Sequence, residues 1–160
     1  MEQEVVFCRG LTDSLKRSMP KHRWTSDDIS HDSHGYDIDR LARELFLLHD
    51  LDGDGLLGED ELVQINLTIA VLHHGDNADL VHVEDSYRAM FREQFSPEGH
   101  DAIRFGCFRG YLLDLLRNID PDVKAQKMIL EQFITEAAVA REVRFQELQA
   151  SREAGVTFLC

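Results

Sequence analysis

Residues 50–61 read DLDGDGLLGEDE and place carboxylates at regular intervals along a glycine-rich stretch. Alternate carboxylates on a tightly turning loop converge on one point, and their oxygens are the ligands that a hard cation such as Ca²⁺ prefers. Gly55 permits the sharp bend that a side chain would resist. The carboxylates available as ligands are those of Asp50, Asp52, Asp54 and Glu61. The stretch therefore predicts a site for one Ca²⁺ ion.

This stretch, which we call the first loop, resembles the EF-hand calcium loop at every diagnostic position. Counted from Asp50, carboxylates occupy places 1, 3, 5 and 12, and glycine occupies place 6. The resemblance implies that Leu56 offers its backbone carbonyl, that a water fills the place of Gly58, and that Glu61 binds with both oxygens. A bidentate carboxylate favours Ca²⁺ over the smaller Mg²⁺, which requires stricter octahedral geometry.

A second stretch, residues 96–107, keeps the cadence of the first loop but has lost most of its ligands. Only Ser96 and Glu98 offer side-chain oxygens readily at the corresponding places. Asp101 replaces the glycine of the bend, and Cys107 stands at place 12. A thiol is a poor substitute for a bidentate carboxylate when the ion is hard. We expect no Ca²⁺ in this second loop.

The second loop is expected to act as a structural brace for the first, because one helix–loop–helix unit cannot bury its apolar faces alone. The resemblance is to paired EF-hand proteins of calmodulin-like plan and extends over residues 37–118. It implies a short antiparallel ladder between the loops. Leu57 and Ile103, at place 8 of each loop, are the residues expected to pair.

The predicted fold class is all-α, a paired EF-hand lobe followed by a long C-terminal helix. Apolar residues at helical spacing predict helices over about residues 37–49, 62–73, 79–95, 106–118 and 121–154. Asp37 suits an N-cap, and Pro121 suits the first turn of the last helix. The apolar stripe expected on the last helix consists of Val123, Leu130, Phe133, Ala137, Ala140 and Val143. At a rise of about 1.5 Å per residue this helix exceeds the lobe, so part of it should protrude, and its distal half should serve interactions.

These features divide the chain into three parts. Residues 1–36 form a basic arm and linker, residues 37–118 the lobe, and residues 119–160 the long helix with a short apolar tail. Residues 1–24 hold five basic and three acidic side chains, a net charge of +2, whereas the remainder holds 12 basic and 27 acidic ones, a net charge of −15. Residues 5–19 resemble the basic amphipathic helices that sensor EF-hands bind. They could occupy the chain's own groove or await another partner.

Composition narrows the function classes. The 160-residue chain carries a net charge of −13, which argues against nucleic acid and anionic membrane as main partners. It has no apolar run long enough to span a membrane, and three sparse cysteines favour a reducing, cytoplasmic location. No arrangement of nucleophile and base indicates an enzyme. His49 stands where the family has a core phenylalanine, either as a neutral core histidine or as a proton-sensitive modulator of the site.

Two functions follow as hypotheses. The first is a Ca²⁺ sensor or adaptor that changes its protein contacts, made through the groove, the long helix and the arm, when the ion binds. The alternative is a structural EF-hand subunit of a larger assembly, cytoskeletal or ciliary, in which Ca²⁺ is a fixed staple. Four methionines in all give little support to a promiscuous Met-rich groove.

Overall fold

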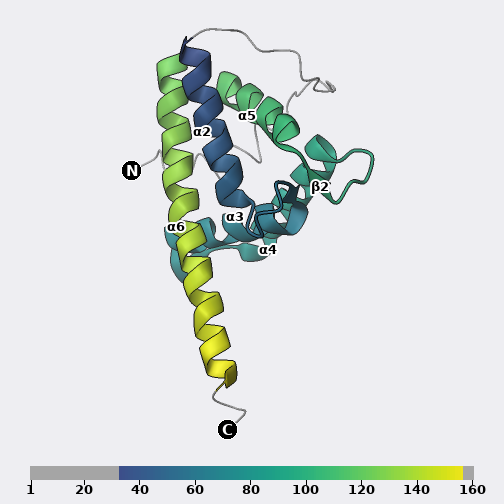
Figure 1. The fold of residues 1–160 in the computed structure, drawn as a ribbon, viewed down its shortest axis with the longest axis vertical. Helices are drawn as coiled ribbons and strands as arrows, with labels where there is room; N and C mark the ends of the chain where they lie inside the picture. Colours follow the sequence, from purple (N-terminus) through teal and green to yellow (C-terminus); the bar gives the residue numbers. More distant parts are fainter. Residues whose placement is uncertain (1–32, 157–160) are drawn as a thin grey trace.

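The computed structural model describes residues 33–156, and these residues are mostly helical with one small antiparallel sheet (Figure 1). The α-helices are α2 (Ser33–His49), α3 (Glu59–His74), α4 (Leu80–Met90), α5 (Phe105–Ile119) and α6 (Val123–Val156). A 3₁₀ turn, η1 (Gly75–Asn77), follows α3, and a π-helical turn, η2 (Phe91–Phe95), continues α4. The two strands are β1 (Leu57–Gly58) and β2 (Ala102–Ile103). The prediction of a mainly helical fold with a two-stranded ladder is confirmed.

Every predicted helix within this range is present, but several ends differ. Helix α2 begins at Ser33, so Asp37 lies inside it and the prediction of an N-cap there is wrong. Helix α3 begins at Glu59, directly after β1, with three acidic residues in its first turn. Carboxylates there interact favourably with the positive end of the helix dipole, which supports the early start. Helix α6 begins at Val123, so Pro121 precedes the helix and the prediction that it lies in the first turn is wrong.

One hydrophobic core joins α2, α3, α4, α5 and α6. Helix α6 lies along α2 for much of its length and also packs on α3 (Figure 1). Alanines on its inner face are fully buried, and their small side chains allow close approach of the helices. The buried apolar residues of α6 are Leu130, Phe133, Ala137 and Ala140. The face of the lobe formed by α2 and α3 is therefore covered by the chain's own last helix.

The predicted stripe of α6 differs from the observed one in its first turn. Val123 is 40% exposed, whereas Gln126 is buried. The Nε2 of Gln126 donates to the carbonyl of Asp120 at 2.8 Å, which satisfies an amide that would otherwise be costly to bury. Val143, at the other end of the stripe, is half-buried.

The distal part of α6 extends past the other helices, as Figure 1 shows. From Phe145 to Ala154 every side chain is exposed, so the predicted protrusion is confirmed. None of the described helices is both long enough and apolar enough to cross a bilayer. The basic arm, most of the linker and the apolar tail, with their predicted docking, lie outside the described residues.

Candidate metal centre

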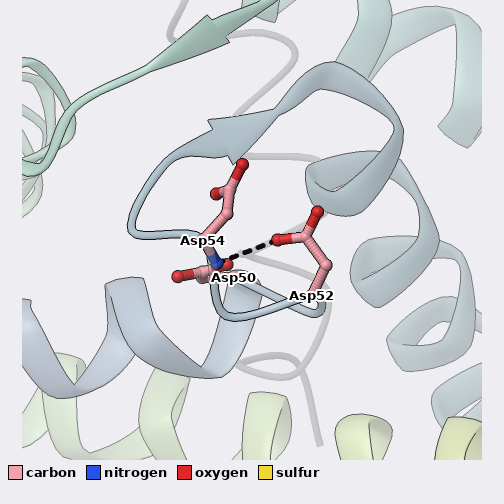
Figure 2. Close-up of side chains that lie close together, drawn as sticks. All are labelled: Asp50, Asp52 and Asp54. Carbon is pink, nitrogen blue, oxygen red and sulfur yellow. Dashed lines mark hydrogen bonds between the residues drawn. The ribbon is translucent and has the colours of Figure 1, made fainter.

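The first loop gathers three carboxylates between α2 and α3. Asp50, Asp52 and Asp54 each offer an oxygen, and these oxygens lie within 4.8 Å of one another (Figure 2). Gly53 and Gly55 have φ values of 74° and 83°, in the left-handed region that glycine adopts without a steric penalty. The bend predicted at Gly55 is confirmed, and with it the convergence of the three aspartates.

Main-chain N–H groups of the loop hold all three carboxylates in place, and the donor to Asp54 is Leu56. Asp50 is 2% exposed, its Oδ1 accepts from the N–H of Gly53 at 2.8 Å, and its Oδ2 accepts from Gly55 at 2.9 Å. The Oδ1 of Asp52 accepts from the N–H of Asp54 at 3.0 Å, the bond drawn in Figure 2. Because these donors belong to the turn itself, the loop backbone and the carboxylate cluster stabilise each other.

Glu61 lies outside the cluster of three and binds the backbone at both ends of the loop. Its Oε1 accepts from the N–H of Leu51 at 2.8 Å and of Asp52 at 3.2 Å. Its Oε2 accepts from the N–H of Gly58 at 2.8 Å. Each carboxylate oxygen has two lone pairs, so Oε1 is saturated by its two N–H donors and Oε2 keeps one acceptor position. An ion that binds both oxygens must therefore displace one N–H donor from Oε1. Bidentate binding of an ion by Glu61 stays a prediction.

A cleft of about 480 Å³ opens over the outer side of the first loop. Asp52, Asp54 and Leu56 line it from the loop, Arg88 from α4 and Asp101 from the second loop. The N–H of Leu56 donates to Asp54 Oδ1 at 2.8 Å, and the role of its carbonyl as a ligand stays a prediction. Carboxylates predominate among the charged groups of the cleft, so a cation has an attractive approach from solvent.

The second loop contains no comparable cluster among the residues that the structure describes. The hydroxyl of Ser96 donates to the carbonyl of His100 at 2.6 Å, and the exposed side chains of His100 and Glu98 approach each other at 3.5 Å. Cys107 is half-buried, and burial raises the pKa of its thiol. A neutral thiol is a weak ligand for a hard cation, and the hydroxyl of Ser96 is already hydrogen-bonded to the backbone.

The two loops pair through their strands. β1 and β2 run antiparallel, with Leu57 opposite Ile103 and Gly58 opposite Ala102. Leu57 is fully buried and Ile103 is 5% exposed, so both residues also contribute to the core. The predicted pairing at place 8 of each loop is confirmed.

His49, directly before the first loop, is a buried neutral histidine. It is 5% exposed, and its Nδ1 donates to the carbonyl of Leu45 at 2.9 Å. Its ring lies 6.2 Å from that of Phe108, among the aromatic side chains of the core. Burial lowers the pKa of His49 from 6.5 to about 4. Of the two interpretations of this residue, the structure favours the core histidine.

Two arginines near the site were not predicted from the sequence. Arg88 of α4 binds carboxylates of the first turn of α3, Glu59 at 3.0 Å and Asp60 at 2.8 Å, and these bonds raise its pKa. Arg141 of α6 reaches the end of α2, where its Nη1 lies 2.8 Å from the carbonyl of Asp50. Arg141 and Asp50 are 91 positions apart in the sequence, and no local sequence pattern predicts a contact between them.

Comparisons with protein families, with curated proteins and with solved structures gave no match for this chain. The assignment of the site therefore depends on its own residues. Those residues are a cluster of Asp50, Asp52 and Asp54 in a turning loop between two helices, which is compatible with an EF-hand loop and with a bound metal ion.

Proposed function

We propose that the protein binds one Ca²⁺ ion in the first loop and acts through protein–protein contacts as an EF-hand calcium sensor or adaptor. The observation that carries this proposal is the set of three carboxylates within 4.8 Å of one another. Oxygen-only ligands suit a hard cation, and carboxylates without His or Cys argue against the softer transition metals. The proposed ligands are the side chains of Asp50, Asp52, Asp54 and Glu61 and the carbonyl of Leu56.

The composition supports protein partners. The net charge of −13 disfavours binding to nucleic acid or to an anionic membrane surface. The distal part of α6 exposes the apolar side chains of Phe145 and Leu148, which are 42% and 49% exposed. We propose no catalytic activity and a cytoplasmic location.

The second candidate function is that of a structural subunit in a larger assembly, with Ca²⁺ as a permanent staple. One observation favours it: α6 already covers the face of the lobe that a sensor would open toward a target. Leu130 and Phe133 are buried there, so a target helix would have to displace them. A cytoskeletal or ciliary setting is one such assembly.

Calorimetric titration of the full chain with Ca²⁺, in about 1 mM Mg²⁺, tests the shared premise. One site with a Kd of roughly 10⁻⁷–10⁻⁵ M supports a sensor, and much tighter binding supports a staple. The variant Glu61→Gln should weaken binding strongly, whereas the matched variant Glu98→Gln, in the second loop, should leave it unchanged. Absence of binding by the intact chain would overturn the proposal.

A hydrophobic dye distinguishes the two candidates once binding is established. A sensor should expose apolar surface when Ca²⁺ binds, so dye fluorescence should rise severalfold. A staple should leave the fluorescence unchanged or lower it, because α6 stays on the lobe. The measurement is made with and without a chelator on the same sample.

A further inference from the structure

The end of α2 is capped by a side chain from α6. The Nη1 of Arg141 lies within hydrogen-bond distance of three acceptors, the carbonyls of Leu47 at 2.9 Å, Leu48 at 3.0 Å and Asp50 at 2.8 Å. The last carbonyls of a helix have no partner within the helix and form the negative end of its dipole. A guanidinium supplies both hydrogen bonds and positive charge to that end.

The N–H, the carbonyl and the carboxylate of Asp50 all form hydrogen bonds. Its N–H donates to the carbonyl of Phe46 at 2.9 Å, which continues the bonding pattern of α2. Its carboxylate accepts from Gly53 and Gly55, and its carbonyl accepts from Arg141. The residue that supplies the first proposed ligand of the ion is therefore also the residue through which α6 contacts the loop.

The neighbouring arginine on α6 has a different partner. Arg144 donates from Nη2 to Oε1 of Gln64 on α3 at 2.6 Å. Both arginines attach the middle of α6 to the lobe, next to Ala140, which is fully buried. Arg141 bonds to the start of the first loop, whereas Arg144 bonds to α3, the helix that follows the loop. Substituting each arginine in turn therefore distinguishes the contact with the loop from the general attachment of α6 to the lobe.

We propose that Arg141 is a positioning residue that couples occupancy of the first loop to the docking of α6. The inference rests on the proposed Ca²⁺ binding. An ion bound by the carboxylate of Asp50 would keep the carbonyl of Asp50 within hydrogen-bond distance of Arg141. Docked α6, through the same hydrogen bond, would keep Asp50 in position to bind the ion. Because such coupling is reciprocal, Ca²⁺ should tighten the docking of α6 by the same factor by which docked α6 tightens Ca²⁺ binding.

The positive charge of Arg141 opposes a cation, so the sign of the coupling depends on which effect is larger. Four ligand carboxylates exceed the charge of one Ca²⁺ ion by two, so the guanidinium still faces a net negative site when the loop is loaded. The hydrogen bond to Asp50, in contrast, is lost if that residue shifts by about 1 Å. We therefore expect the hydrogen bond to outweigh the repulsion, so that Ca²⁺ binding and the docking of α6 favour each other.

This coupling runs opposite to sensor opening. Calcium would hold α6 on the lobe in the arrangement of Figure 1, and the exposed residues from Phe145 to Ala154 would stay presented on a rigid helix. The ion would then act as a lock on the docked state, in keeping with the second candidate function.

The first experiment uses the unmodified full chain and hydrogen exchange of the α6 amides, with Ca²⁺ and with a chelator. Exchange between Leu130 and Arg141 should slow by about 5–150-fold with Ca²⁺, the usual range of coupling between two sites. Unchanged or faster exchange in a sample shown to bind Ca²⁺ would overturn the inference. Absence of Ca²⁺ binding would instead overturn the proposed function, and the inference with it.

The second experiment compares Arg141→Gln, Arg141→Lys and the matched control Arg144→Gln by Ca²⁺ titration. Arg141→Gln should weaken Ca²⁺ binding by at least about 5-fold and remove most of the protection of α6. Arg141→Lys should recover part of the affinity because it keeps charge and donors, which a purely steric role would not predict. Arg144→Gln should leave affinity within about 2-fold. Equal effects of Arg141→Gln and Arg144→Gln, or none from either, would overturn the role of Arg141.

Discussion

Each of the two loops joins two helical segments and carries one short strand, but the loops differ in almost every polar side chain. They pair through one antiparallel ladder, with Leu57 opposite Ile103. The first loop gathers three carboxylates within 4.8 Å, whereas the second forms no such group among the described residues. The proposed binding of an ion is therefore separable from the pairing of the loops, since the ladder joins the two backbones and one buried apolar residue from each loop.

The difference is sharpest at the two ends of the loops. At place 1, Asp50 accepts N–H groups from the turn, whereas the hydroxyl of Ser96 donates to the carbonyl of His100 at 2.6 Å. At place 12, Glu61 accepts N–H groups from both ends of its loop, whereas the half-buried thiol of Cys107 packs against the core. At these two places the second loop has a hydroxyl and a thiol instead of carboxylates, so we expect it to be stable without a cation.

The largest effect is expected at place 1. Asp50→Asn keeps the shape of the side chain but removes a charge from the cluster, so Ca²⁺ affinity should fall at least roughly 1,000-fold, to the millimolar range. Ser96→Ala, at the same place of the second loop, should leave affinity within about 2-fold. Calorimetric titration of both variants measures the contrast. Similar losses from both would mean that the second loop takes part in binding.

Place 8 should show the opposite result, with two equal effects. Leu57→Ala and Ile103→Ala each remove a buried side chain from the ladder, and each should lower the free energy of unfolding by about 2–5 kcal/mol. Urea unfolding in a chelator measures this without a contribution from the ion. If only Leu57→Ala destabilised the protein, the second loop would not be the brace that the ladder indicates.

The features predictable from the sequence are mainly the local ones. The alternation of Asp50, Asp52 and Asp54 around glycines specifies the turn and the cluster, because each of the three carboxylates finds an N–H donor within a few residues. The pairing of Leu57 with Ile103 is not local, and its prediction came from the resemblance of the two loops to a paired EF-hand. The long helix followed from the absence of a breaker after Pro121.

The features that escaped prediction depend on contacts between distant segments. The capping of α2 by Arg141 joins residues far apart in sequence, and a charged residue on a helix does not by itself indicate its acceptor. Gln126 is buried because its amide finds the carbonyl of Asp120. Asp37 has the side chain of an N-cap, yet α2 continues back to Ser33, which shows how weakly a single capping residue fixes a helix end.

The residues before the loops, His49 and Phe95, should differ in their response to acid. Both are buried, and the pKa of His49 is about 4 in the folded chain against 6.5 ordinarily. Since the unfolded chain binds the proton more readily, stability is complete above about pH 6.5 and is lost as pH falls toward 4. Between about pH 7 and pH 4.5, His49→Phe should lose about 2–3 kcal/mol less stability than the wild type.

Chelator is present throughout this measurement, and urea unfolding at each pH supplies the free energies. The other acidic groups titrate in both proteins, so the difference between the two curves isolates the histidine. Parallel curves for the two proteins would show that His49 takes up a proton without cost, and that the entrances of the two loops do not differ in this respect.

The smallest effect is expected at place 12 of the second loop. Cys107 is only half-buried, and burial raises the pKa of its thiol, so the side chain acts as a small apolar group rather than as a thiolate ligand. Cys107→Ala should lower the free energy of unfolding by about 1 kcal/mol or less and leave the Ca²⁺ titration unchanged. Glu61→Gln, its counterpart in the first loop, should reduce Ca²⁺ affinity strongly. A change in Ca²⁺ stoichiometry with Cys107→Ala would make the second loop part of the metal site, and the separation of bracing from binding would then fail.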